Sequence, residues 1–168
     1  GRSSVSAVVN ETRAITGGGY ESGIVSTMDL ITLATSANAT DFGDITAGRQ
    51  NMASNLSNSH GGILPGEQRP SVTYMPGSGR AFIGGGDPGN SDIIQILNIP
   101  TAGNTSDFGN LTQGRYELGA VGSRTRAVFG GGKYDSTIVN IIDSVEMQSQ
   151  GNAADFGDLT QARHKGGA

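Results

Sequence analysis

The sequence predicts an all-β fold built from three similar units of about 46 residues, and internal repetition is the main reason. An arginine followed by a short apolar run and three glycines occurs at Arg13, Arg80 and Arg126. After each copy comes an Asp-Phe-Gly motif, and eight residues beyond its aspartate a closing arginine ends the unit. A period of this length is typical of four-stranded β-propeller blades, whose repeats run roughly 40 to 50 residues.

The spacing of these motifs defines the units. Arg80 and Arg126 are 46 residues apart, whereas Arg13 and Arg80 are 67 apart, so the first unit carries an insertion. We expect one repeat domain over residues 1–168, divided into repeat 1 (about 13–79, with the insertion at 54–78), repeat 2 (about 80–125) and repeat 3 (about 126–168). Residues 1–12 are expected to complete the last strand of a preceding or closing blade.

Composition favours a folded, turn-rich β protein with small cores. Glycine accounts for 28 of 168 residues, apolar residues for 35% and charged residues for only 15%. Disordered chains combine low hydrophobicity with high charge, whereas here the apolar residues recur in register. Because each unit is poor in large side chains, we expect neighbouring units to cover one another.

Charge and hydrophobicity also exclude several classes of partner. The net charge is −4 and no basic run occurs, which argues against binding nucleic acid through its phosphates. No stretch approaches the roughly 18 apolar residues of a membrane-spanning helix, so membrane insertion is not expected. The absence of cysteine excludes disulfides and thiolate metal sites.

Each unit is expected to begin with two strands. The apolar run after the first arginine predicts a buried strand, and the glycines leave room for positive φ or close backbone approach. A polar loop follows, and then a longer strand at 28–33, 94–99 and 142–147. Polar residues interrupt the alternation in this second strand, which predicts a β-bulge or two partly buried faces.

The Asp-Phe-Gly motif is expected to form a tight turn, because Asx side chains bond to the nearby backbone and glycine accepts unusual dihedral angles. Its phenylalanine is the predicted apolar anchor of the unit. The closing arginine is expected to pair with the aspartate eight residues earlier, and a small-residue strand such as 118–121 leads to the next unit. The predicted structural residues of the repeats are Asp41, Phe42, Arg49, Asp107, Phe108, Arg115, Asp155, Phe156 and Arg163.

These motifs resemble the kelch-type β-propeller repeat, in which a strand ending in glycines begins a four-stranded blade. They are more closely similar to a variant in long, repeat-rich structural proteins of tailed marine phages, especially cyanophages. That variant repeats Arg-x-Val-Phe-Gly-Gly-Gly and Asn-Ala-Thr-Asp-Phe-Gly-Asp-Leu-Thr-x-x-Arg, but this chain lacks the tryptophan of ordinary kelch repeats. The resemblance implies kelch-like blades in a virion component, such as a tail fibre, located on the particle outside the cell.

Three sequence units are too few for an ordinary propeller ring. Arg2 is in register with Arg163, so residues 3–10 continue a strand that the C-terminal residues only begin. Unpaired blade edges favour association. The sequence leaves open self-association that completes a ring, a longer parent chain, and an unconventional three-bladed closure.

Catalysis is not expected, nor is any cofactor or bound metal. The chain has two histidines and no cysteine, from which no catalytic triad or copper site can be assembled. A glycan-cleaving enzyme would need two carboxylates at a defined separation, whereas the repeated acids fall in predicted turns. Calcium binding by the paired acids of these motifs, such as Asp41 with Asp44 and Asp155 with Asp158, is the weaker alternative to a structural turn.

The function predicted from the sequence is a non-enzymatic structural or adhesion module of a phage virion, with a carbohydrate-binding, lectin-like propeller as the alternative. Expected partners are further copies, neighbouring repeats or virion proteins, and a host-surface glycan. Long insertions in repeat scaffolds often carry function, and the insertion is expected either to pack within the assembly or to bind a ligand. Candidate ligand-binding residues lie in the loops and the insertion: Tyr20, Tyr134, His60, Glu67, Arg69 and Tyr74.

Overall fold

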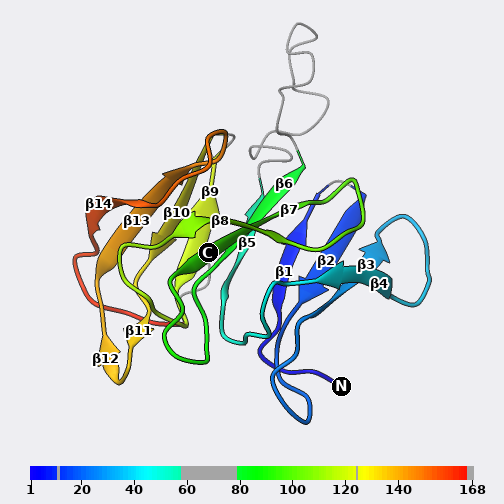
Figure 1. Cartoon of the computed structure of the whole chain (residues 1–168), viewed down its shortest axis with the longest axis horizontal. Coiled ribbons are helices and arrows are strands. Elements are labelled where there is room, and N and C mark those ends of the chain that lie inside the picture. Colours follow the sequence, from blue (N-terminus) through cyan, green and yellow to red (C-terminus); the bar gives the residue numbers. More distant parts are fainter. Residues whose placement is uncertain (11, 58–78, 124, 166–168) are drawn as a thin grey trace, which may run out of the picture.

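The structure, a computed structural model, describes residues 1–10, 12–57, 79–123 and 125–165. Within these residues it contains strands and no helix, which confirms the predicted all-β class. Twelve of the strands form three four-stranded sheets, and two short strands form a separate hairpin (Figure 1).

Each sheet is an antiparallel meander in chain order. Sheet 1 contains β1 (Ser6–Val9), β2 (Arg13–Gly17), β3 (Thr27–Thr32) and β4 (Thr40–Asp44). Sheet 2 contains β5 (Ala53–Ser57), β6 (Arg80–Gly84), β7 (Ile93–Asn98) and β8 (Ser106–Asn110). Sheet 3 contains β9 (Gly119–Gly122), β10 (Arg126–Gly130), β13 (Ile141–Glu146) and β14 (Ala154–Asp158), and the hairpin is β11 (Lys133–Tyr134) with β12 (Thr137–Ile138).

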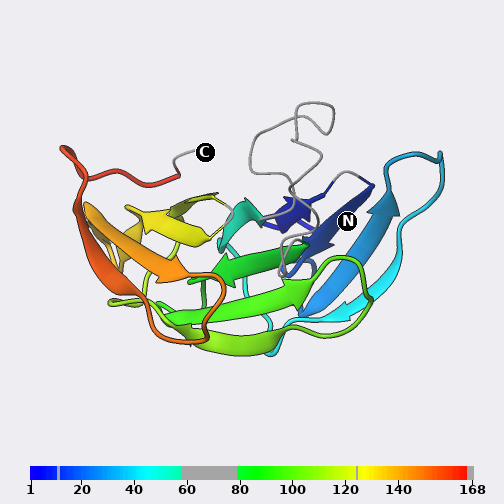
Figure 2. The ribbon, with the colours of Figure 1, turned by 90° about the horizontal axis from the view of Figure 1, so that it is seen from above.

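The three sheets follow one another along an open arc, with β1, β5 and β9 side by side on its inner side (Figure 2). β1 pairs with β2, so residues 6–9 form the first strand of the same sheet as the Arg13 motif. Each sheet therefore takes its first strand from the residues before an arginine motif and its other three strands from the residues after it.

A β-bulge is present at the same place in all three sheets, but its extra residue is the phenylalanine of the fourth strand and not a residue of the longer strand for which a bulge was predicted. Pairing between the third and fourth strands shifts register after Met28, Ile94 and Ile142. The third strand pairs with the second strand of its sheet without any shift, so the bulge does not explain its polar residues. They reflect the other predicted possibility, burial on both faces: the neighbouring residues Ile94 and Gln95 are both fully buried.

The prediction of a tight turn at Asp-Phe-Gly is wrong, because the motif lies within the fourth strand of each sheet. In sheets 1 and 2 the phenylalanine side chain of this strand points into the space between two sheets, where Phe42 and Phe108 are buried. The glycine that follows has positive φ, 143° at Gly43 and 157° at Gly109. Each glycine pairs with the residue before the bulge, so its freedom serves the register shift and not a turn.

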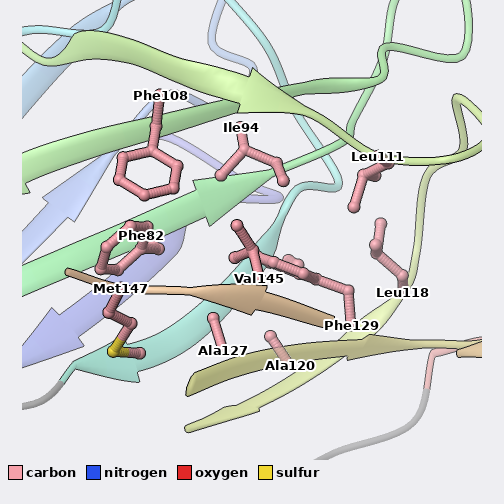
Figure 3. Close-up of a cluster of buried hydrophobic side chains, with 11 residues drawn as sticks. Phe82, Ile94, Phe108, Leu111, Leu118, Ala120, Ala127, Phe129, Val145 and Met147 are labelled. Carbon is pink, nitrogen blue, oxygen red and sulfur yellow. The ribbon is translucent and has the colours of Figure 1, made fainter. Parts of the chain in front are cut away.

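The hydrophobic core lies between sheets, not within them. One cluster joins sheets 1 and 2, at what we call junction 1–2, and a second joins sheets 2 and 3, at junction 2–3. In the second cluster the rings of Phe82 and Phe108 pack edge to face, with 4.9 Å between their centroids. They face Val145 and Met147, which belong to the unit of sheet 3 (Figure 3). The two faces of sheet 2 thus pack on different neighbours, as expected for units that cover one another.

Candidate functional site

The backbone carbonyl of each closing arginine is bonded to the sheet that precedes it. The N–H of Gly19 donates to the carbonyl of Arg49 at 2.8 Å, and Gly86 donates to Arg115 at 2.9 Å. The glycines that precede the two donors, Gly18 and Gly85, have positive φ. A Cβ added at Gly85 would lie 2.5 Å from the carbonyl oxygen of Arg115. The triple glycine therefore provides both the positive φ and the close approach that were predicted for it.

The side chain of Arg115 enters the next sheet, not its own. Its Nη2 lies 2.9 Å from Oδ2 of Asp143, and both side chains are fully buried. The Asp143 carboxylate also accepts from the backbone N–H of Thr112 at 3.2 Å and from its hydroxyl at 2.5 Å. The predicted pairing of Arg115 with Asp107 is therefore wrong: the chain crosses to begin sheet 3 at this point, and Asp107 is exposed on sheet 2.

Arg49 occupies the corresponding place at junction 1–2, where none of the described residues forms an ion pair with it. Its Nη1 donates to the carbonyls of Gly85 and Ile93, at 3.1 and 3.2 Å, and to the hydroxyl of Ser91 at 3.0 Å. The position that corresponds to Asp143 is Gln95. The predicted partner of Arg49, Asp41, is exposed on the preceding sheet.

Gln95 forms neutral hydrogen bonds at the place where junction 2–3 has the ion pair. Its side-chain nitrogen donates to the Thr46 hydroxyl, and its oxygen accepts from the Thr105 hydroxyl at 2.8 Å. Burial lowers the pKa of Arg49, and the charge of Asp92 only partly opposes this effect. Burial likewise lowers the pKa of Arg115, against the charge and hydrogen bond of Asp143.

The ends of the described chain show the same pattern. Arg2, which lies before sheet 1, forms an ion pair with Asp29, the residue of sheet 1 that corresponds to Asp143. Arg163 follows sheet 3, and its carbonyl accepts from Gly132 at 2.9 Å, as in the other units. Its side chain is exposed and its Nε lies 3.4 Å from the carbonyl of Gln161.

The loops that follow β2, β6 and β10 lie at one edge of the arc, the lower edge of Figure 1. Two candidate ligand-binding residues, Tyr20 and Tyr134, are exposed there. Tyr20 follows β2 of sheet 1 and Tyr134 lies on β11, which follows β10 of sheet 3, so sheet 2 lies between them and they do not form one site within a single copy. Asn90 and Asp135 join the loops of sheets 2 and 3. Nδ2 of Asn90 donates to Oδ1 of Asp135 at 2.6 Å, and the backbone N–H of Asp135 donates to Oδ1 of Asn90 at 3.0 Å.

Sequence reasoning missed a charged cluster on Glu117. Its carboxylate lies 2.9 Å from Nδ1 of His164, 3.3 Å from Nζ of Lys165 and 3.5 Å from Nζ of Lys133. Burial alone would raise the pKa of Glu117, but the hydrogen bonds and positive charges of these neighbours outweigh it and lower the pKa. The spacing of these residues in the sequence does not indicate that they meet.

The backbone of Glu117 belongs to a series of backbone hydrogen bonds that runs from one sheet to the next, which we call the ladder. Asn51 donates its N–H to the carbonyl of Ser4 at 3.4 Å, Glu117 donates to Asn51 at 2.9 Å, and Lys165 donates to Glu117 at 2.9 Å. All four residues have φ between 53° and 56°. The ladder therefore repeats one strained backbone conformation at the start of each sheet and again after sheet 3.

The remaining site predictions concern the insertion and metal binding. His60, Glu67, Arg69 and Tyr74 lie outside the residues that the structure describes. Among the described residues, no group of three or more histidines, aspartates or glutamates is placed to hold a metal ion. The Asp44 carboxylate accepts from the hydroxyl of Ser26 at 3.0 Å, which is a local structural role.

Comparison with known proteins adds no family assignment. No protein-family model matches the chain, and no curated protein is similar to it in sequence. In the part of the chain that the structure describes, no helix has the length and apolar character needed to cross a membrane.

Proposed function

We propose that the chain is a non-enzymatic structural or adhesion module of a phage virion, a tail fibre or surface component, and that its sheets are kelch-like propeller blades. The sheets support the blade assignment because each is a four-stranded antiparallel meander. Their first strands lie side by side on the inner side of the arc, as the innermost strands of blades do around an axis (Figure 2).

The observation that carries this proposal is the repetition of one junction. Both junctions combine a buried apolar cluster, an arginine that bonds to two sheets, and a glycine in close contact with the next sheet. A junction that repeats can extend a scaffold by stacking, since each unit contacts only its neighbours. Such a scaffold holds the loops at one edge in fixed relative positions.

Rigid display explains how such a module would work. Loops that each bind weakly act together when a particle presents many copies, because binding at one site raises the effective concentration at the next. The module needs no catalytic group for this role. Its location would be the particle surface, outside the host cell.

The direct test is the protein content of purified virions. Particles of a phage whose genome encodes this chain are banded on a density gradient, and their peptides are identified by mass spectrometry. Peptides of the chain should be present at many copies per particle and should remain after nuclease and detergent washes. Their absence from intact particles, together with their presence in the infected-cell lysate, would overturn the proposal.

A carbohydrate-binding propeller is the second candidate, and the exposed Tyr20 and Tyr134 at the loop edge favour it. Aromatic faces at a protein surface can pack against the apolar faces of sugar rings. A glycan array probed with the wild type and with a Tyr20→Ala/Tyr134→Ala variant tests this function. The matched control, Tyr20→Phe/Tyr134→Phe, keeps both rings and should keep binding; equal binding by all three proteins would contradict the lectin function.

A further inference from the structure

We propose that a second copy of this chain docks head to tail, with the outer face of sheet 3 of one copy packed on the outer face of sheet 1 of the other. This inference deepens the scaffold function proposed above and rests on it for its purpose. The two outer faces are the two halves of a junction that the chain already forms twice internally. They lie at opposite ends of the arc (Figure 2).

The outer face of sheet 3 exposes apolar groups whose counterparts are buried. Phe156 is 55% exposed, whereas Phe42 and Phe108 at the corresponding positions are 3% and 4% exposed. Val121 is exposed, whereas its counterpart Val8 is buried against sheet 2. This face therefore has the composition of a junction half that no described residue covers.

The outer face of sheet 1 is the opposite half. Leu33 is 53% exposed, whereas Ile99 and Met147 at the corresponding positions are completely buried. Ile99 packs into the cluster that contains the apolar side chains of sheet 1, and Met147 packs into the cluster that contains those of sheet 2. Leu33 would meet the outer face of sheet 3 in the same way.

Backbone groups on the two faces are also complementary. At junction 1–2 the N–H groups of Gly103 and Thr105 donate to the carbonyls of Phe42 and Asp44, each at 2.9 Å. Junction 2–3 repeats the pair, with distances of 3.1 and 2.8 Å. The corresponding groups at the outer faces belong to exposed residues, namely Ala37 and Ala39 as donors and Phe156 and Asp158 as acceptors.

The glycine of the fourth strand shows that space is open on sheet 3. A Cβ added at Gly43 would lie 2.6 Å from the carbonyl oxygen of Gly103 across junction 1–2. At Gly157, which has a similar φ of 133°, no atom of the described residues lies within 4 Å of such a Cβ. The same close approach is therefore possible for a docking chain.

Side chains add directional contacts that set the register. Asn104 accepts through Oδ1 from the Asp44 N–H at 2.9 Å, and Asn152 accepts from the Asn110 N–H at 3.0 Å. Asn38 is the corresponding residue on the outer face of sheet 1, where it is exposed. It would accept from the N–H of Asp158 in the other copy.

The arginine that precedes the apolar run of each unit makes a second directional contact. Arg13 donates to the Ile99 carbonyl at 3.2 Å, and Arg80 donates to the Met147 carbonyl at 3.0 Å. Arg126 is the third member of this set, and it lies over the Phe156 ring with 5.9 Å to the centroid. Its Nε and Nη2 also donate to Oε1 of Glu146, at 3.0 and 2.8 Å, so Nη1 is the atom that would donate to the Leu33 carbonyl of a docked copy.

Two copies are the expected number. Propellers typically have roughly four to eight blades. Residues 1–165 supply three sheets, and two copies of them supply six, which falls within this range. Two identical head-to-tail contacts would then close a symmetric pair.

Residues 163–165 and residues 2–4 would compete for one position in this pair. Lys165 extends the ladder beyond Glu117, and Ser4 begins the ladder before Asn51, so the two segments have the same role at neighbouring sheets. Arg2 already pairs with Asp29 of its own sheet 1. Removing residues 163–168 should therefore strengthen the association.

The experiment measures the mass of the chain in solution by sedimentation equilibrium over a wide concentration range. The wild type should form a pair with twice the chain mass. Phe156→Asp and Leu33→Asp should each raise the dissociation constant by about tenfold or more. Because both side chains are exposed in one copy, circular dichroism and thermal melting below the association range should be unchanged.

Two further samples make the test specific. Ile138→Asp changes an exposed apolar residue on the β11–β12 hairpin, away from both outer faces, and should associate like the wild type. An equal mixture of the Phe156→Asp and Leu33→Asp variants contains mixed pairs with one unaltered contact, so it should associate more tightly than either variant alone. That result is expected only for head-to-tail docking.

A wild type that remains monomeric at all concentrations would overturn the docking proposal. So would association that survives both substitutions, or association that is not strengthened by removal of residues 163–168. None of these outcomes bears on whether the chain is found in purified virions, so failure of the docking is distinguishable from failure of the proposed function.

Discussion

Junctions 1–2 and 2–3 have the same shape but different polar chemistry. At junction 2–3 Arg115 and Asp143 form an ion pair with both side chains fully buried. At junction 1–2 Arg49 bonds to two carbonyls and a hydroxyl, and Gln95 takes the place of the aspartate. A buried arginine can therefore be accommodated here with or without a counter-charge.

The comparison shows which features the junction requires. The apolar clusters, the arginine carbonyl contact and the backbone bonds to the fourth strand occur at both junctions. Among the described residues the ion pair occurs at only one junction, and Nε and Nη1 of Arg115 are buried there without a hydrogen-bond partner. Because a buried ion pair is weak grounds for net stability, the common apolar and backbone contacts carry the fold.

The largest effect is expected from breaking the ion pair on one side. Asp143→Ala should lower the free energy of unfolding by about 3–5 kcal/mol, because it leaves Arg115 buried without a counter-charge. Gln95→Ala, the matched change at junction 1–2, removes only neutral hydrogen bonds and should cost about 1–3 kcal/mol. Urea denaturation followed by circular dichroism measures both.

Equal losses for these two variants would contradict the distinction between the junctions. Asp143→Asn provides a milder second measurement if Asp143→Ala does not fold, since it keeps the size of the side chain and an acceptor for Thr112. Its loss should fall between the losses of the other two variants.

A backbone change should be nearly as damaging and independent of the polar chemistry. Gly43→Ala places a Cβ 2.6 Å from the Gly103 carbonyl oxygen in a region of φ that disfavours side chains. We expect a loss of about 2–4 kcal/mol in the free energy of unfolding. Gly157→Ala has similar dihedral strain but open space around the Cβ, so it should lose less.

The two glycine variants are compared by the same urea denaturation in a Phe156→Asp background, which keeps the outer face of sheet 3 free of a docked copy. The difference between them measures the close contact with the next sheet. If both lose the same amount, backbone strain alone explains the effect and the contact contributes nothing.

A smaller effect is expected when junction 1–2 is given the chemistry of junction 2–3. Gln95→Asp supplies a carboxylate to Arg49 and acceptors to Thr46, but it shortens the side chain that Thr105 contacts. These effects oppose each other, so the free energy of unfolding should change by no more than about 1 kcal/mol. A loss as large as that of Asp143→Ala would show that the Arg49 position cannot use a counter-charge.

Repetition made much of this fold predictable. The two strands after each arginine motif, the burial of both faces in the second of them and the role of the triple glycine follow from residues that recur in register. The prediction of a turn at Asp-Phe-Gly is wrong because the burial of Phe42 and Phe108 between sheets outweighs the local turn preference of aspartate and glycine. Single-residue preferences for turns are weak against that burial.

The partners of the closing arginines were not predictable from spacing within a unit. Asp107 is near Arg115 in the sequence, but the chain crosses to a new sheet between them, and the partner Asp143 lies 28 residues ahead. One signal was present: the third position of the third strand holds Asp29, Gln95 and Asp143, which is a polar residue in an apolar strand each time. A buried polar side chain needs a partner, and that requirement could have identified the arginine.

The smallest effect is expected from acid, and it also separates the two junctions. The ladder residue at junction 2–3 is Glu117, which has a lowered pKa, whereas junction 1–2 has the neutral Asn51. A lowered pKa in the folded state gives stability that is present above the unfolded value of about 4.5 and is lost as the pH falls through the folded value. Glu117→Gln should therefore lower stability near pH 7 by no more than about 1 kcal/mol, because its partners are partly exposed, and should match the wild type in strong acid.

Thermal melting between pH 7 and pH 3 measures this, with Glu21→Gln, an exposed glutamate paired with the N-terminal amine, as the control that should leave most of the slope unchanged. A wild type and Glu117→Gln variant that differ equally at every pH would show that the loss comes from packing, and that the charge of Glu117 does not hold residues 163–165 against sheet 3.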